Sequence, residues 1–166
     1  MAGIGRPTFN LVDHDGLAVT EATYTGLWLL VYFGFTHCRV VCPRSLSRLT
    51  RVLDSLPEQL SAALQPLYIS VDPERDRPDV MKQYLEHRYP RFTGLTGSPE
   101  QVEAAKGAFR IFAQRKPDPD DPDGYAVPHT SFAYLIGPDG CYVTHWAETR
   151  SEDEISSDLK QRLVSS

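Results

Sequence analysis

The sequence has little of what would place it in several large protein classes. Its 166 residues include only three cysteines, too few for the disulfide framework of a small secreted protein. The longest apolar run, residues 27–33, is too short to cross a bilayer. Lysine and arginine number 17 against 22 acidic residues, and the net charge of −5 argues against nucleic acid as a partner, which needs a basic face.

The amino terminus shows no charged segment followed by an apolar stretch, so no signal peptide is predicted. The chain as given is expected to be soluble, although an anchored protein without its anchor would have the same sequence. Hydrophobic residues make up 41% and charged residues 23%, as in ordinary globular proteins. We expect one domain over residues 1–166, long enough to bury a core without disulfides.

The first half of the chain alternates between strand and helix patterns. Apolar residues alternate on either side of Asp15-Gly16 and predict a β-hairpin. The apolar run over 27–35 predicts a central strand that is covered on both faces. Leucines at positions 46, 49, 53 and 56 recur at helical spacing and predict a helix from about Pro43. Residues 66–71 predict a second buried strand.

The second half shows several helix-start signals. Asp76 and Pro78 predict a helix toward His87, with Asp76 as the N-cap. Ser98 with Gln101 forms a capping-box pattern that opens another helix. Ser151 with Glu154 gives the same pattern for a C-terminal helix that ends near Val164, and a strand hairpin around residues 137–140 precedes it. Repeated prolines in 116–124 predict an irregular loop.

These elements predict an α/β fold. The order is hairpin, strand, helix, strand, helix, an extra helix, strand hairpin and helix. Strands followed by helices on a mixed central sheet leave few arrangements. We expect a thioredoxin-like sandwich, with the mixed sheet flanked by helices, an N-terminal β-hairpin and an inserted helix.

Cys38 and Cys42 lie where the first central strand gives way to a helix. Proline is tolerated only in the first turn of a helix, so Pro43 places both cysteines near the helix start. Unpaired N–H groups and the helix dipole there favour thiolate, the form that attacks disulfides and binds metals. Three interpretations follow: a buried structural pair, a dithiol–disulfide couple, or two ligands for Cu(I) or Zn(II).

A metal site needs a further ligand, and the histidines differ in their suitability. His37 is expected to point away from its neighbour Cys38, and His87 to be a solvated residue late in a helix. His14 lies in the hairpin turn and His145 in a late strand. His129 precedes the strand that, in thioredoxin-like folds, begins beside the cysteine turn, so it is the candidate third ligand.

Two further features have less specific interpretations. Asp72, Glu74, Arg75 and Asp76 form a charged run after a strand. They predict either a solvated turn with a helix cap or loop residues that shape partner docking near the metal. Cys141 belongs to no motif and is expected to be a buried or half-buried bystander.

Three segments carry a family resemblance: LWLLVYFGFTHCRVVCP (27–43), LYISVDPERDRPDVMKQY (67–84) and VPHTSFAYLIGPDG (127–140). In this order and spacing they resemble the Sco/SenC family of copper-binding assembly factors for cytochrome c oxidase. The resemblance implies that Cys38, Cys42 and His129 bind one copper ion, as Cu(I) or Cu(II). It also implies a role in building the CuA centre, by copper delivery, by reduction of the CuA cysteines, or by both.

The resemblance implies partners and a location as well. The partners would be the cytochrome c oxidase subunit that carries CuA and a copper donor protein. Family members are usually anchored by an N-terminal segment, so a membrane anchor is expected in the full-length protein. The location would be the extracytoplasmic face of a membrane, in the bacterial periplasm or, as the alternative, the mitochondrial intermembrane space.

The chain departs from the family pattern at two places. Arg39-Val40 stands where Pro-Asp is usual, and Pro128 stands where the family often has Asp before the histidine. The cation beside Cys38 is expected to favour bare thiolate over a bound metal ion. The second change removes a carboxylate that would orient the imidazole. These changes leave two alternatives open, a weaker copper site or a bias of the cysteine pair toward redox work. Neither change touches a ligand, so copper remains the favoured ion.

Rival functions use the same cysteines. In a thiol–disulfide oxidoreductase, Cys38 would attack and Cys42 would resolve, without need of a histidine. A peroxidase of the peroxiredoxin type is disfavoured, because that class has Thr three residues before its reactive cysteine and this chain has Phe35 there. A structural zinc would need a fourth ligand, and the sequence offers no candidate. We expect a metallochaperone rather than an enzyme.

Overall fold

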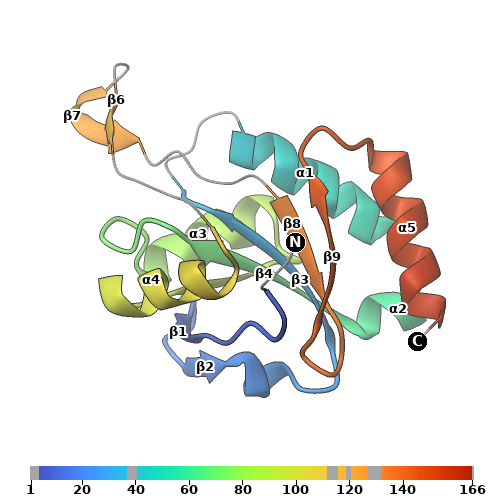
Figure 1. Ribbon diagram of the computed structural model, residues 1–166. Coiled ribbons are helices and arrows are strands. Elements are labelled where there is room, and N and C mark those ends of the chain that lie inside the picture. The colour runs from blue at the N-terminus through green and yellow to red at the C-terminus, as the bar shows by residue number, and fades with distance from the viewer. Residues whose placement is uncertain (1–3, 37–40, 112–115, 119–120, 127–131, 166) are drawn as a thin grey trace.

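The computed structural model describes residues 4–36, 41–111, 116–118, 121–126 and 132–165, and side chains at 41–42, 116–118 and 121–126 are outside the description. A mixed seven-stranded sheet runs through the molecule in the order β2-β1-β5-β4-β3-β8-β9 (Figure 1). Its strands are β1 (Asn10–Asp13), β2 (Ala18–Thr20), β3 (Trp28–Gly34), β4 (Leu64–Ser70), β5 (Thr93–Thr96), β8 (Phe132–Ile136) and β9 (Tyr142–Ala147).

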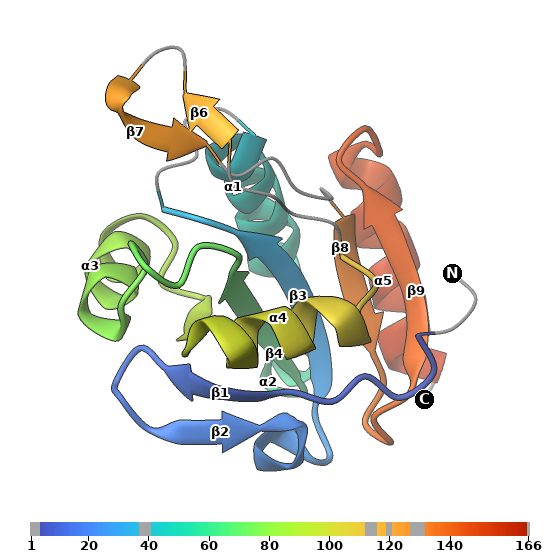
Figure 2. The same ribbon diagram turned by 60° about the vertical axis from the view of Figure 1, so that its left-hand side comes forward.

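The three central strands β3, β4 and β5 are parallel, and the outer pairs are antiparallel. The helices are η1 (Glu21–Tyr24, a 3₁₀ turn), α1 (Val41–Asp54), α2 (Glu58–Ala62), α3 (Pro78–Arg88), α4 (Pro99–Ala108) and α5 (Glu152–Ser165). Helix α4 crosses one face of the sheet, and α1 and α5 cover the other face (Figure 2). The predicted thioredoxin-like α/β class is confirmed.

Strand β3 is central because both of its faces are apolar. All seven of its residues are buried. Leu30 and Tyr32 pack with the side chains of α1, α3 and α5, whereas Leu29, Val31 and Phe33 pack with those of α4 and the amino-terminal segment. Successive side chains of a strand point to opposite faces, so one apolar run supplies both cores. The predicted central strand, hairpin and C-terminal helix are confirmed.

Besides the ribbon described below, the sequence pattern does not anticipate the 3₁₀ turn η1, helix α2 and strand β5. Strand β5 is only four residues long and contains Gly94. A Cβ at this glycine would lie 3.0 Å from Leu85 Cδ1 and 3.1 Å from Met81 Cε, so helix α3 packs directly on the backbone there. The residue that allows this close packing also interrupts the apolar pattern by which a strand is predicted.

The loop predicted for 116–124 is wrong. Strands β6 (Lys116–Asp118) and β7 (Asp121–Ala126) form an antiparallel two-stranded ribbon, with an irregularity between Pro117 and Asp118. Each strand of such a ribbon has one unpaired edge, where a residue without an N–H removes no ladder hydrogen bond. The ribbon projects from the end of the molecule at which α1 begins (Figures 1 and 2).

Candidate copper site

The predicted ligands lie at the limits of the described structure. Cys42 is the second residue of α1, so its backbone is in the first helical turn, as the sequence predicts. Its side chain, all of Cys38 and all of His129 lie outside the described residues. The convergence of these three ligands therefore remains a prediction.

Strand pairing relates the chain segments that carry Cys38 and His129. Strand β8 runs antiparallel to β3, and Tyr32 pairs with Ala133. Cys38 comes six positions after Tyr32, and His129 comes four positions before Ala133. Because neighbouring antiparallel strands exchange ends, the chain leaves β3 at the edge of the sheet where it enters β8. The two segments thus join the sheet at the same edge and on adjacent strands.

The described residue nearest to Cys38 is Thr36, and a buried carboxylate holds it. The Thr36 N–H donates to Asp76 Oδ2 at 3.0 Å, and the Thr36 hydroxyl donates to Asp76 Oδ1 at 2.5 Å. Ser70 Oγ, at the end of β4, donates to Asp76 Oδ2 at 2.8 Å. Asp76 is 0% exposed, and three donors from two strand ends converge on it. The carboxylate therefore ties the chain just before Cys38 to the end of the neighbouring strand.

The pKa of Asp76 follows from this environment. Burial is the largest cause and raises the pKa above its ordinary value of 3.8, and the negative charge of Asp72 acts in the same direction. The hydrogen bonds from Thr36 and Ser70 oppose this shift. The net direction is upward, because desolvation of the charged form outweighs the donors.

A second buried acid lies beside Asp76 and has its own cation. Asp72 is 2% exposed, and Arg75 Nε lies 2.5 Å from Asp72 Oδ2. The Arg75 guanidinium also lies over the ring of Phe35, 5.9 Å from its centroid. The Asp72 N–H donates to Ser70 Oγ at 3.0 Å, which connects the two acids through one hydroxyl. A buried carboxylate requires such pairing, because its desolvation is otherwise very unfavourable.

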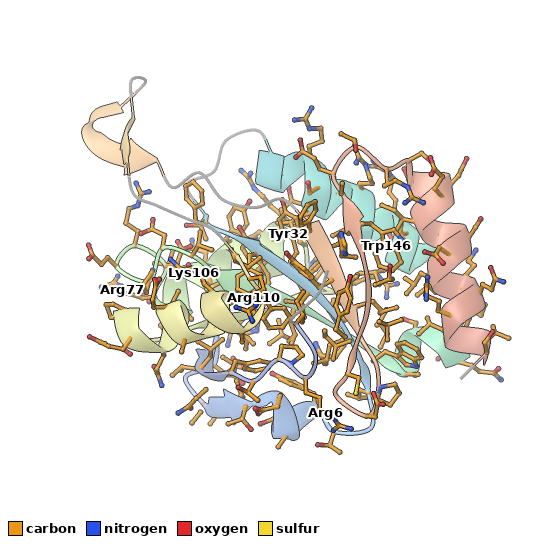
Figure 3. The ribbon with its side chains drawn as sticks, viewed as in Figure 1. Arg6, Tyr32, Arg77, Lys106, Arg110 and Trp146 are labelled. Atoms are coloured by element: carbon orange, nitrogen blue, oxygen red, sulfur yellow. The ribbon has the colours of Figure 1, made fainter. Side chains whose placement is uncertain are left out.

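These contacts correct the predicted solvated turn. Asp72 and Asp76 are buried and Arg75 is half-buried, so Glu74 is the one exposed member of this charged run of four. Asp76 is also not the N-cap of α3: that position is Arg77, which makes no capping hydrogen bond with its side chain. The Asp76 carboxylate faces Thr36, which is half-buried, and Ser70, which is buried, instead of capping the helix. Arg77 lies at the outer surface (Figure 3).

The start of α1 has its own contact with the body of the protein. The Tyr89 hydroxyl, at the C-cap of α3, donates to the Pro43 carbonyl at 3.4 Å. Residues on both sides of positions 37–40 are thus held by polar contacts, from Asp76 on one side and from Tyr89 on the other. Sequence reasoning missed Thr36, Ser70 and Tyr89. The one signal in the sequence was Asp76 itself, an acidic residue in a helix-start pattern. In the structure its carboxylate does not cap the helix.

Three other histidines and the third cysteine lie within the described residues, whereas His37 lies outside them. His87 is exposed in the last turn of α3, as predicted. His14 Nδ1 accepts from the Gly94 N–H at 3.1 Å, and His145 Nδ1 lies 2.5 Å from the Tyr142 hydroxyl on β9. Cys141 is a half-buried free thiol, as expected. Within the described part of the chain, no group of three or more His, Cys, Asp or Glu side chains could hold a metal ion.

Comparison with known proteins identifies the family. The SCO1/SenC family model matches residues 3–164. The chain belongs to the SCO1/SenC family. It is 38% identical to the human mitochondrial protein SCO2 homolog over 164 residues, which cover 98% of this chain and 61% of the human protein. The chain thus spans about six tenths of the length of this curated relative.

Solved structures of relatives show the same fold. Arabidopsis thaliana ScoI, determined with copper bound, has a TM-score of 0.90 and 32% identity, covering 99% of this chain and all of that one. Yeast Sco1 with copper bound has a TM-score of 0.86 and 33% identity, covering 96% of this chain and 88% of that one. Homologous proteins of the family therefore bind copper. None of the helices in the described ranges has both the length and the apolar character that crossing a bilayer requires.

Proposed function

We propose that this protein is a copper chaperone that holds one copper ion through Cys38, Cys42 and His129 and assists assembly of the CuA centre of cytochrome c oxidase. The observation that carries the proposal is the pairing of β3 with β8, which leads the Cys38 and His129 segments away from one edge of the sheet. The copper-bound structures of Arabidopsis ScoI and yeast Sco1 support the choice of metal.

The donor set fits this cargo. Two thiolates and one imidazole are soft to intermediate ligands that suit Cu(I), and a weak fourth position would admit Cu(II). The position of Cys42 in the first turn of α1 favours its thiolate, because the helix N-terminus stabilises negative charge. A site with three protein ligands also leaves room for a ligand of the acceptor, so copper leaves by ligand exchange.

The proposed partners are the oxidase subunit that carries CuA and a protein that donates copper. The proposed location is the extracytoplasmic face of a membrane, in the bacterial periplasm or the mitochondrial intermembrane space, with a membrane anchor in the full-length protein. The family membership and the human mitochondrial relative support this assignment.

Copper titration tests the ligand set. Reduced protein is titrated with Cu(I) against a competing chelator, and Cys42→Ala and His129→Ala are compared with the parent. Each variant should lose affinity by roughly a hundredfold or more, because even outer-shell partners of a metal ligand cost about 10–100-fold when removed. Cys141→Ala and His87→Ala are matched controls, since both residues lie outside the proposed site, and they should bind as the parent does. Undiminished affinity in either ligand variant would exclude that residue from the site.

The second candidate function is thiol–disulfide exchange, favoured by the placement of Cys42 at a helix start. Cys38 thiolate would attack a partner disulfide, and Cys42 would then displace the partner's second thiol. The partner leaves reduced, and Cys38 and Cys42 become a disulfide. This chemistry needs no imidazole. His129→Ala should therefore abolish CuA assembly if copper delivery is the function, and should leave it intact if thiol exchange is.

A further inference from the structure

We propose that Asp76 is a positioning residue for the cysteine pair: it fixes the chain at Thr36 and so limits the freedom of the segment that carries Cys38. The expected effect on Cu(I) affinity rests on the proposed function. The expected effect on the dithiol–disulfide equilibrium rests on Cys38 and Cys42 alone. Asp76 itself is not proposed to touch the metal.

The geometry gives Asp76 this role because its two oxygens bind different parts of the chain. Oδ1 accepts from the Thr36 hydroxyl, whereas Oδ2 accepts from both the Thr36 N–H and Ser70 Oγ. A carboxylate that binds one residue through both its backbone and its side chain fixes the position and the orientation of that residue. Thr36 lies two residues before Cys38 and two residues after the end of β3.

The rest of the loop holds Asp76 in place. Its N–H donates to the Asp72 carbonyl at 2.9 Å, and Asp72 is held in turn by Arg75 and by Ser70 Oγ. The Val71 N–H donates to the Gly34 carbonyl at 2.8 Å, so the β3–β4 pairing continues to the residues beside Thr36. The carboxylate is therefore fixed on a rigid base, as a positioning group must be.

The functional consequence is a loss of preorganisation when Asp76 is changed. Copper binding closes a ring through Cys38 and Cys42, and so does disulfide formation. Both closures are more favourable when the flanking chain is already ordered, because less conformational entropy is lost on closing. When the contacts of Thr36 with Asp76 are lost, both copper binding and disulfide formation should become less favourable.

The primary test uses the dithiol–disulfide equilibrium, which involves no copper. Reduced protein and glutathione disulfide are equilibrated with oxidised protein and two glutathione thiols, and the species are quantified after acid quenching. Asp76→Asn presents an amide NH₂ to groups that are themselves donors, so it should lower the equilibrium constant for disulfide formation about tenfold. For a two-electron couple this raises the potential by about 30 mV. Cu(I) affinity should fall about tenfold by the same loss of preorganisation.

Milder variants guard against a simple folding defect. Thr36→Val removes the side-chain hydrogen bond and keeps the shape of the side chain, so it should lower the equilibrium constant for disulfide formation as Asp76→Asn does. Thr36→Ser keeps the hydroxyl, so its equilibrium constant should stay at the parent value. Asp158→Asn is the matched control, because the Asp158 carboxylate on α5 accepts a hydrogen bond from Trp146 Nε1 at 2.9 Å. It should lower stability and leave the thiol equilibrium unchanged.

The inference is overturned if Asp76→Asn and Thr36→Val stay within twofold of the parent, or if Asp158→Asn shifts the equilibrium as much as they do. The copper proposal fails separately. If the parent protein does not bind Cu(I) through Cys42 and His129, the chaperone function is excluded, and the glutathione equilibrium still decides the role of Asp76.

Discussion

Helices α3 and α4 begin with similar sequences, yet their starts are built differently. Each has an N-capping residue type shortly before a proline, Asp76 before Pro78 and Ser98 before Pro99. At α4 the capping box forms, with Ser98 Oγ accepting from the Gln101 N–H at 3.1 Å. At α3 the carboxylate is buried against Thr36 and Ser70, and the helix begins without a side-chain cap.

Asp76 could either cap α3 or accept hydrogen bonds from Thr36 and Ser70, and the free energies of the two roles differ. A side-chain cap contributes about 1 kcal/mol. Each buried donor left without an acceptor costs about 1–3 kcal/mol. Ser70 is buried and Thr36 is half-buried, and their three donors together outweigh one helix cap, so Asp76 accepts from them instead of capping α3. A residue of N-capping type that does not cap its helix thus indicates a polar contact elsewhere. For Asp76 this contact is with Thr36 and Ser70, beside the cysteine turn.

The largest expected effect comes from removing the Asp76 carboxylate, which precedes α3. Asp76→Ala should destabilise the reduced protein by about 3 kcal/mol or more, because it removes the acceptor of three hydrogen bonds in a mostly buried site. Denaturant unfolding measures this. Asp139→Ala is the control, since Asp139 is a solvated turn residue that accepts from the Cys141 N–H, and it should cost far less. If Asp76→Ala and Asp139→Ala lowered the free energy of unfolding equally, burial of Asp76 would not account for its contribution.

The corresponding change at α4 should have a smaller and purely structural effect. Ser98→Ala removes the capping acceptor and should cost about 1 kcal/mol in the free energy of unfolding. The dithiol–disulfide equilibrium should stay at the parent value, because the capping hydrogen bonds of Ser98 are made with Gln101 within its own helix start. A shifted thiol equilibrium in this variant would erase the contrast between the two helix starts.

Helix α3 should gain stability from a cap that it lacks. Arg77 has the extended backbone of an N-cap, with φ −75° and ψ 163°, but makes no capping hydrogen bond. Arg77→Ser places a hydroxyl at that position and should stabilise the protein by about 0.5–1 kcal/mol. Arg77→Ala is the matched control for loss of the arginine itself. If Ser is no more stable than Ala, the start of α3 is not limited by its missing cap.

The smallest expected effect is a pH dependence that belongs to Asp76. Its pKa is raised in the folded protein, chiefly by burial, so the fold holds this proton more tightly than the unfolded chain does. That contribution is complete below the unfolded pKa and is lost as the pH rises through the raised folded value. The stability of the parent relative to Asp76→Asn should therefore fall as the pH rises above the ordinary pKa of 3.8 and through the raised folded value. A difference that is flat or grows with pH would contradict the raised pKa.

Local patterns predicted those parts of the fold that depend on local physics. The hairpin at Asp15-Gly16, the central strand and the Ser98 capping box are each specified by neighbouring residues, and all are confirmed. Strand β5 could not be predicted, because position 94 requires a glycine for the close packing of α3, and a glycine interrupts the apolar pattern of a strand. The ribbon β6–β7 was missed, because prolines are compatible with strands whose edges are unpaired.

The candidate site was predictable only in its local half. The position of Cys42 at a helix start follows from Pro43, one residue away, and is confirmed. The partner of Thr36 lies 40 positions further along the chain, and no local pattern specifies such a contact. The joining of Cys38, Cys42 and His129 around one ion remains a prediction of the same long-range kind.

X-ray absorption at the copper edge of reduced protein loaded with one equivalent of Cu(I) tests this convergence most directly. The account predicts two sulfur scatterers and one nitrogen scatterer in the first shell, with the nitrogen lost in His129→Ala and one sulfur lost in Cys42→Ala. A copper shell of sulfur alone that is unchanged in His129→Ala, or a protein that does not retain the ion, would contradict it.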